Sequence, residues 1–243
     1  MKKRLRIFAG PNGSGKSTIL SIVRNENIHL GVYVNADDLK RNINASHRFD
    51  FSEYNCLFDF LNFTESFRAS ALFGQADGTD LLQYMRAEGD ILYFDRDVND
   101  YFTSFLAAFL RENLLECGEK FTFETVMSHR SKLDFLQKAR NKGFRIYLYY
   151  VSLENPLLNK ARVASRVLQG GHDVPEDKIV ERYNRSMDLL LEAIRLSDRV
   201  YYLFDNSSSH PVLFAKMENG ELSVVDGIQI LPQWFDTYVL SRL

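Results

Sequence analysis

The chain has 243 residues and a mass of 28.2 kDa, which suits one α/β domain with an elaboration rather than two full domains. Hydrophobic residues make up 45% and charged residues 26%, a composition that excludes a disordered or low-complexity protein. The formal net charge of −2 excludes a basic field over the whole molecule, so we expect no nucleic-acid partner.

That charge is unevenly distributed, because residues 1–48 sum to +6 and residues 49–100 sum to −8. Cys56 and Cys117 are the two cysteines, so no disulfide framework is expected and a reducing compartment is favoured. No stretch approaches the roughly 18 apolar residues of a membrane span. We therefore expect a cytoplasmic protein without a membrane partner.

A short apolar strand, residues 5–9, leads directly into a glycine-rich loop and then a helix-forming run, residues 19–24. The loop fits the pattern G-x-x-x-x-G-K-[ST] and reads Gly10-Pro11-Asn12-Gly13-Ser14-Gly15-Lys16-Ser17-Thr18. Its glycines let backbone N–H groups turn toward phosphates at the positive end of a helix. Lys16 would contact the β- and γ-phosphates and the Ser17 hydroxyl would ligate Mg²⁺. The motif predicts binding of ATP with Mg²⁺.

A second predicted strand, residues 32–34, precedes Asp37 and Asp38. In α/β sheets the carboxyl ends of the strands face the ligand, so one of these acids could accept a proton from an acceptor hydroxyl. Capping of the following helix is an equally good interpretation. Three acids end apolar strands and could be a second metal ligand: Asp95, Glu124 and Asp205. Asp95 lies in the acidic segment, which favours a surface role there.

A basic segment follows a predicted strand at 147–151. Lys160, Arg162 and Arg166 precede a Gly170-Gly171 break, and a second predicted helix carries Arg182 and Arg185. Two arginine-bearing helices around a turn suit a kinase lid that clamps the γ-phosphate and excludes water. A solvated helical hairpin is the alternative. The chain contains neither a guanine-recognition signature nor the signature of ABC-transporter ATPases. A small-molecule kinase is therefore the simplest class of P-loop protein that the sequence fits.

Several motifs occur in one order and together resemble the zeta-toxin-like P-loop kinases, in the branch often labelled predicted ABC-type ATPase. Besides the P-loop they are Asn35-Ala36-Asp37-Asp38, Phe123-Glu124-Thr125, Arg162-Val163-x-x-Arg166-Val167-x-x-Gly170-Gly171-His172-x-Val174-Pro175, Arg182-Tyr183-x-Arg185-Ser186 and Asp205-Asn206-Ser207. The similarity spans about residues 4–48 and 118–210.

The resemblance implies a three-layer P-loop kinase fold with a parallel sheet and a helical lid, using ATP and Mg²⁺. Zeta toxins phosphorylate the sugar of UDP-N-acetylglucosamine, and an antitoxin protein neutralises them. By match to the motifs, Asp37 would be the base, while Asp38, Glu124, Thr125 and Arg162 would lie at the substrate. The lid arginines on the triphosphate would be Arg166, Arg182 and Arg185.

The chain departs from the family between the second and third motifs, where roughly 85 residues replace a short helical connection. The extra segment, about 49–110, holds eleven of the 19 Phe residues and the net charge of −8. Residues 54–67 and 101–114 predict apolar-faced helices, so we expect a helical insert within one domain. It could be a cap over the acceptor pocket, a partner surface or a packed elaboration.

Beyond the lid, the sequence predicts a hairpin turning at residues 218–221 and a closing helix through Trp234. The function predicted as a whole is transfer of the ATP γ-phosphoryl group to a hydroxyl of a small molecule. Two other functions stay open: a P-loop ATPase or nucleotide switch acting on a protein partner, and a nucleic-acid end kinase, against which the acidic insert argues.

Overall fold

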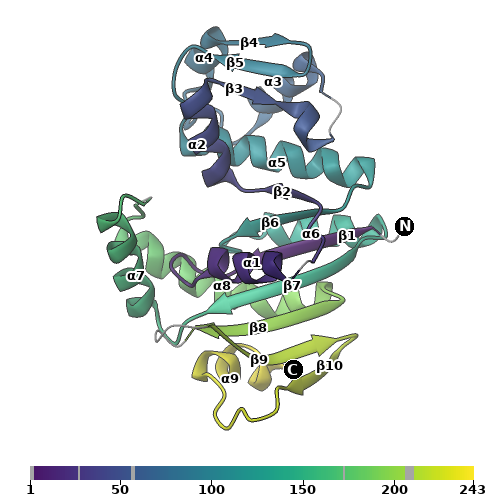
Figure 1. The fold of residues 1–243 in the computed structure, drawn as a ribbon, viewed down its shortest axis with the longest axis vertical. Coiled ribbons are helices and arrows are strands. Elements are labelled where there is room, and N and C mark those ends of the chain that lie inside the picture. The colour runs from purple at the N-terminus through teal and green to yellow at the C-terminus, as the bar shows by residue number, and fades with distance from the viewer. Residues whose placement is uncertain (1–2, 27, 56–57, 172, 206–210) are drawn as a thin grey trace. The chain divides into compact units, whose positions relative to one another are not determined.

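The computed structural model describes residues 3–26, 28–55, 58–171, 173–205 and 211–243. Two compact units divide the chain (Figure 1). The larger unit comprises Met1–Leu30 and Thr122–Leu243, and the smaller unit comprises Gly31–Phe121. The smaller unit therefore begins and ends outside the predicted insert at 49–110, because it also includes the second predicted strand and the helix that carries Asp37.

A mostly parallel sheet forms the centre of the larger unit, as predicted for the fold class. Its strands run in the order β10-β9-β8-β7-β1-β6. Their bounds are β1 (Arg4–Ala9), β6 (Phe121–Thr125), β7 (Arg145–Ser152), β8 (Arg199–Asp205), β9 (Pro211–Glu218) and β10 (Glu221–Val224). The strands β1, β7 and β8 pair in parallel, whereas β9 and β10 add antiparallel strands at one edge.

Helices cover both faces of this sheet. In Figure 1, α1 lies on one face, and α6 and α8 lie on the other. The helices are α1 (Lys16–Asn25), α6 (Ser131–Asn141), α7 (Pro156–Leu168), α8 (Glu176–Leu196) and α9 (Gln233–Tyr238), with a short 3₁₀ turn η3 (Leu240–Arg242) at the end. Coverage of both faces explains why consecutive residues are buried in these strands, Leu5 to Ala9 in β1 and Leu148 to Ser152 in β7.

The predicted hairpin and closing helix are both present at the end of the chain. Asn219 and Gly220 have φ angles of 54° and 87°, the left-handed pair that a two-residue hairpin turn requires. Helix α9 then packs through Trp234, whose ring centroid lies 5.7 Å from that of Phe214 and 6.0 Å from that of Tyr150. None of the helices in the described ranges combines the length and apolar character of a membrane span.

The smaller unit is a mixed α/β structure, whereas the sequence predicted only helices for its insert. Its three-stranded antiparallel sheet has the order β3-β5-β4. The elements are β2 (Val32–Val34), α2 (Ala36–Ser46), β3 (Arg48–Asp50), η1 (Phe51–Tyr54), α3 (Phe60–Ala69), α4 (Gly78–Leu81), η2 (Leu82–Tyr84), β4 (Met85–Glu88), β5 (Ile91–Phe94) and α5 (Asp100–Cys117). The two predicted helices correspond to α3 and α5.

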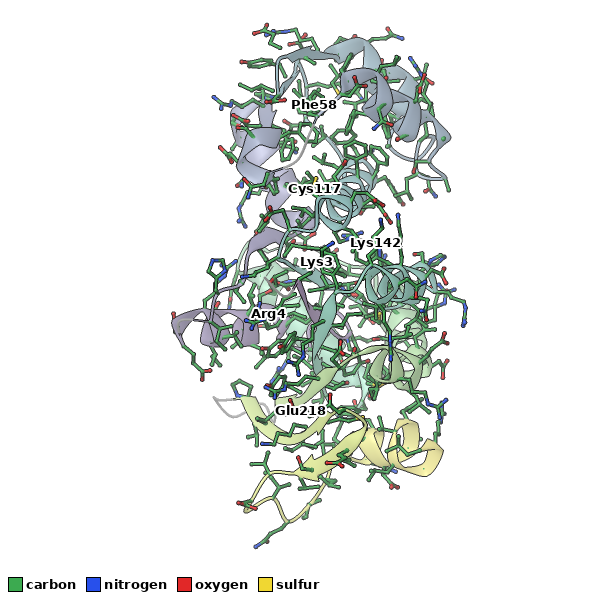
Figure 2. All side chains as sticks on the ribbon, turned by 90° about the vertical axis from the view of Figure 1, so that its right-hand side faces the viewer. Lys3, Arg4, Phe58, Cys117, Lys142 and Glu218 are labelled. Carbon is green, nitrogen blue, oxygen red and sulfur yellow. The ribbon has the colours of Figure 1, made fainter. Side chains whose placement is uncertain are left out.

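The phenylalanines of the smaller unit form its core. Phe63 is fully buried, and its ring centroid lies 5.1–6.3 Å from those of Phe51, Phe58, Phe102, Phe105 and Phe109. Most of these pairs meet edge to face, the arrangement that the ring quadrupole favours. Figure 2 labels Phe58 among the side chains of this unit. The unit thus has its own hydrophobic core.

Truncation of Phe63 tests the importance of this core. We expect Phe63→Ala to lower the free energy of unfolding by about 3–5 kcal/mol, because it opens a cavity among five rings. Phe60→Ala is the control, since Phe60 lies in the same helix with 36% of its surface exposed. Differential scanning calorimetry of both variants measures the difference. Equal losses from the two substitutions would contradict the assignment of Phe63 to the core.

Candidate nucleotide-binding site

The glycine-rich loop lies between the carboxyl ends of three neighbouring strands. It follows β1, and its Gly10 N–H donates to the carbonyl of Thr125 at the end of β6, at 3.3 Å. On the other side, a Cβ added to Gly10 would lie 1.9 Å from the carbonyl oxygen of Val151 in β7. Only glycine fits there, so the start of the loop is fixed by strands on both sides.

Lys16 and the start of α1 provide the charges expected of a phosphate site. The Lys16 Nζ donates to the carbonyls of Gly10 and Pro11, each at 2.9 Å, so its ammonium lies over the loop. Gly15, in the left-handed region with φ 100°, is the N-cap of α1 and offers no side chain to the N–H groups of the first turn. These N–H groups and the helix dipole favour an anion at this position.

Ser17 and Glu124 are brought together by the fold. Although 107 positions apart in sequence, they are joined by a hydrogen bond in which the Ser17 hydroxyl donates to Glu124 Oε2, at 3.0 Å. Glu124 lies near the end of β6, beside β1 in the sheet. A hydroxyl and a carboxylate oxygen at this distance are hard donors of the kind that Mg²⁺ prefers, so the residues fit the ion that the P-loop implies.

The two other strand-ending acids have different positions. Asp95 follows β5 in the antiparallel sheet of the smaller unit, where it is exposed, as the sequence indicated. Asp205 ends β8, which is separated from β1 by β7. The Glu124 carboxylate contacts the P-loop through Ser17.

Helix α7 packs directly against the glycine-rich loop. A Cβ added to Gly13 would lie 2.7 Å from the carbonyl oxygen of Asn159, 3.2 Å from Cγ2 of Val163 and 3.5 Å from Cβ of Arg162. Gly13 itself has φ 74°. The contact places the Cβ of Arg162 beside the P-loop. It also identifies Asn159, which the sequence analysis missed because one Asn in a helix carries no signal.

The predicted pair of lid helices is present as α7 and α8. Val163, Val174 and Ile179 form a small buried cluster between them, and Lys160 pairs with Glu176 at 2.9 Å. At the base of the pair, the Tyr183 hydroxyl donates to the carbonyl of Leu153 at 3.0 Å. Burial raises the pKa of Tyr183 to about 12, so this donor keeps its proton well into the alkaline range.

The three other lid arginines differ in their surroundings. Arg166 is exposed at the end of α7, and a Cβ added to Gly171 would lie 2.5 Å from its Cγ, so the glycine gives this side chain room. Arg182 is half-buried in α8. Arg185 is paired with Glu181, and a hydrogen bond from Lys178 and the charge of Arg185 lower the pKa of that carboxyl. His172 of the same motif lies outside the described residues.

Asn35, rather than either aspartate, is the N-cap of α2. Its Oδ1 accepts from the N–H groups of Asp37 and Asp38, at 2.8 and 3.4 Å. The Asp38 carboxylate is paired with Arg41 at 2.6 Å. Asp37 is exposed, and within the described residues no group hydrogen-bonds or ion-pairs with its carboxylate. The capping alternative for the aspartates is thus wrong, and both side chains lie in the first turn of the smaller unit's α2.

Thr125 follows Glu124 and has a structural contact of its own. Its Oγ1 accepts from the N–H of Met127 at 3.1 Å and so holds the turn after β6.

Two other predicted residues of the glycine-rich loop differ in their burial. Ser14 of the loop is fully buried, and its N–H donates to the carbonyl of Pro11 at 3.3 Å. Thr18 is exposed in the first turn of α1.

Two solved structures resemble this chain in fold. A chain of the AvrRxo1-ORF1:-ORF2 complex crystallised with ATP is 14% identical, with a TM-score of 0.55 over 92% of this chain and 60% of that one. The complex with sulphate ions is likewise 14% identical, with a TM-score of 0.55 over 93% and 62%. The chain therefore shares its fold with that chain of the AvrRxo1 complex. It spans about 60% of the AvrRxo1 chain's length.

Sequence comparison adds one relative. An uncharacterized protein of Haemophilus influenzae (strain ATCC 51907 / DSM 11121 / KW20 / Rd) is 33% identical over 63 residues, which are 26% of this chain and 45% of that protein. No family model matches the chain. The solved structures thus show the fold of the chain, and the zeta-toxin-like resemblance rests on the motifs of the sequence.

A pair of glycine substitutions tests the packing of α7 on the loop. Gly13 and Gly143 have similar φ angles, 74° and 78°, but an added Cβ meets α7 at Gly13 and nothing within 4 Å at Gly143. We expect Gly143→Ala to cost about 1–2 kcal/mol of stability from backbone strain alone. Gly13→Ala should cost clearly more, because it also pushes α7 away. Urea denaturation of the nucleotide-free variants measures both, and equal costs would refute the contact.

Proposed function

We propose that the protein is an ATP-dependent kinase that transfers the γ-phosphoryl group to a hydroxyl of a small molecule. The observation that carries the proposal is the Ser17–Glu124 hydrogen bond beside the P-loop, since it joins the two oxygen donors that a nucleotide-bound Mg²⁺ needs. The fold shared with a protein crystallised with ATP supports the choice of nucleotide.

Different residues of the larger unit would bind different parts of ATP. The glycine-rich loop and Lys16 would hold the phosphates, and Ser17 with Glu124 would hold Mg²⁺, which neutralises charge between the β- and γ-phosphates when bound. Arg162 at the loop, and Arg166, Arg182 and Arg185 on the lid helices, would stabilise the negative charge of the transferred group. The lid helices also exclude water, so that transfer is favoured over hydrolysis.

Asp37 is proposed as the base that accepts the proton of the acceptor hydroxyl. Its exposed carboxylate is not engaged by described neighbours, whereas Asp38 is held by Arg41 and suits a role in binding the acceptor. The acceptor class suggested by the zeta-toxin resemblance is a nucleotide sugar such as a UDP-N-acetyl-sugar, and the same resemblance assigns Thr125 to the substrate.

A protein partner is the second candidate. The AvrRxo1 chain with the same fold was crystallised in the AvrRxo1-ORF1:-ORF2 complex, which supports a bound protein partner for this chain. An antitoxin is the partner that the resemblance of the motifs implies. A nucleotide-switched ATPase acting on such a partner would hydrolyse ATP without producing a phosphorylated small molecule.

Incubation with ATP, Mg²⁺ and a panel of nucleotide sugars, followed by mass spectrometry, separates the two candidates. A kinase adds the mass of one phosphate to an acceptor. Release of inorganic phosphate with every acceptor unchanged, and stimulated by a protein partner, would favour the ATPase instead.

Removal of the Asp37 carboxylate tests the base assignment. We expect Asp37→Asn to keep ATP binding but to lower kcat by about 100-fold or more, because the amide cannot accept the proton. Asp38→Asn is the matched comparison and should act on KM for the acceptor. Lys16→Ala, which should abolish both ATP binding and transfer, is the negative control. Transfer by Asp37→Asn at the wild-type rate would disprove the assignment.

Glu124→Gln tests the metal site. The amide keeps the size of the side chain but loses the negative charge that would attract Mg²⁺. We expect the Mg²⁺ concentration for half-maximal activity to rise about 10-fold to 100-fold. The control is Glu221→Gln, an exposed residue of β10, which should leave the Mg²⁺ dependence unchanged. An unaltered Mg²⁺ titration in Glu124→Gln would exclude Glu124 from the metal site.

A further inference from the structure

Asn159 lies at the contact between α7 and the glycine-rich loop. It occupies the second turn of α7, four residues after the N-cap Asn155, and is fully buried. Its Nδ2 donates to the main-chain carbonyl of Asn12 at 2.6 Å, a hydrogen bond between residues 147 positions apart. One residue further along the loop, Gly13 packs against the backbone of Asn159 itself.

This buried amide is costly for the fold. The Asn159 Oδ1 is buried and has no hydrogen-bond partner among the described residues, and the same holds for the Oδ1 of Asn12. An unsatisfied buried acceptor costs roughly 1–3 kcal/mol, whereas an apolar side chain of similar size would avoid that cost. Asn is also a poorer helix former than Leu. Stability of α7 alone therefore does not explain an asparagine at this position.

The hydrogen bond explains what the amide does. The Asn12 carbonyl belongs to the peptide that connects Asn12 to Gly13, so the bond fixes the orientation of that peptide within the loop. On the same helix, Arg162 follows Asn159 by three residues and Val163 by four, and both lie against Gly13. The side chain of Asn159 therefore contacts the loop from the same helix that carries Arg162.

We propose that Asn159 is a positioning residue that joins α7 to the P-loop, so that the loop and the lid arginine Arg162 act as one preorganised unit on the triphosphate. The proposal rests on the proposed ATP-binding function. It predicts that loss of the Asn159 donor loosens the loop and weakens nucleotide binding without unfolding the helix.

The experiment compares Asn159→Leu with Asn155→Ala. Leucine fills the volume of Asn159 without the donor, whereas Asn155→Ala removes the N-cap, whose Oδ1 accepts from the N–H groups of Leu157 and Leu158 at 3.0 and 3.3 Å. Hydrogen–deuterium exchange of the nucleotide-free proteins is read for a peptide covering residues 10–17. Calorimetric titration with Mg-ATP then gives the dissociation constant.

We expect faster exchange in residues 10–17 and an about 10-fold weaker Mg-ATP affinity in Asn159→Leu, the loss of one hydrogen bond to the loop. Asn155→Ala should lower the melting temperature but leave both readouts near those of the wild type. Combining Asn159→Leu with Arg162→Ala should cost less than the sum of the two, because both act through one contact.

Unchanged exchange at residues 10–17 in Asn159→Leu would overturn the proposal, as would full additivity with Arg162→Ala. Equal changes in Asn155→Ala would do the same, since they would show a general effect of helix stability. A wild-type protein that fails to bind Mg-ATP would instead refute the proposed function, because the exchange measurement contains no nucleotide and still reports whether Asn159 holds the loop.

Discussion

The close approach of backbone to backbone around the glycine-rich loop is the constraint on which the larger unit depends. Gly10 lies against the carbonyl oxygen of Val151 in β7, and Gly13 lies against the carbonyl oxygen of Asn159 in α7, at distances that no Cβ could occupy. The backbone of the loop therefore has little room to change its conformation. Its conformation is set by the strands and the helix around it, which makes the phosphate site a property of the sheet and the lid together.

The polar contacts near the loop fix the positions of side chains and backbone groups rather than add to the stability of the fold. Glu124 accepts from Ser17, and Asn159 holds the Asn12 carbonyl although its own carbonyl oxygen has no partner among the described residues. Burial of a polar group without a partner is costly, so the Asn159 amide lowers the stability of the fold while it holds the loop. The buried contact between α7 and α8 differs from these polar contacts, because its cluster of Val163, Val174 and Ile179 is purely apolar.

The smaller unit is stabilised by a hydrophobic core of its own. Its short strands could not form a stable sheet alone, and a packed cluster of phenylalanines on α3, α5 and η1 gives them a face to bury against. The same unit carries Asp37 on α2. The long segment that interrupts the family pattern is therefore an α/β structure with a core of its own, and it shares its unit with the proposed base.

The sequence by itself determined the features that depend on neighbours along the chain. The P-loop between a strand and a helix, the Asn219-Gly220 hairpin and the two lid helices follow from local rules of glycine conformation and apolar spacing. Only the tertiary structure decided that Glu124 meets Ser17, that β3, β5 and β4 form a sheet and that Asn159 reaches Asn12. These contacts depend on segments that are far apart in sequence, so their energies appear only when the strands and helices are packed together.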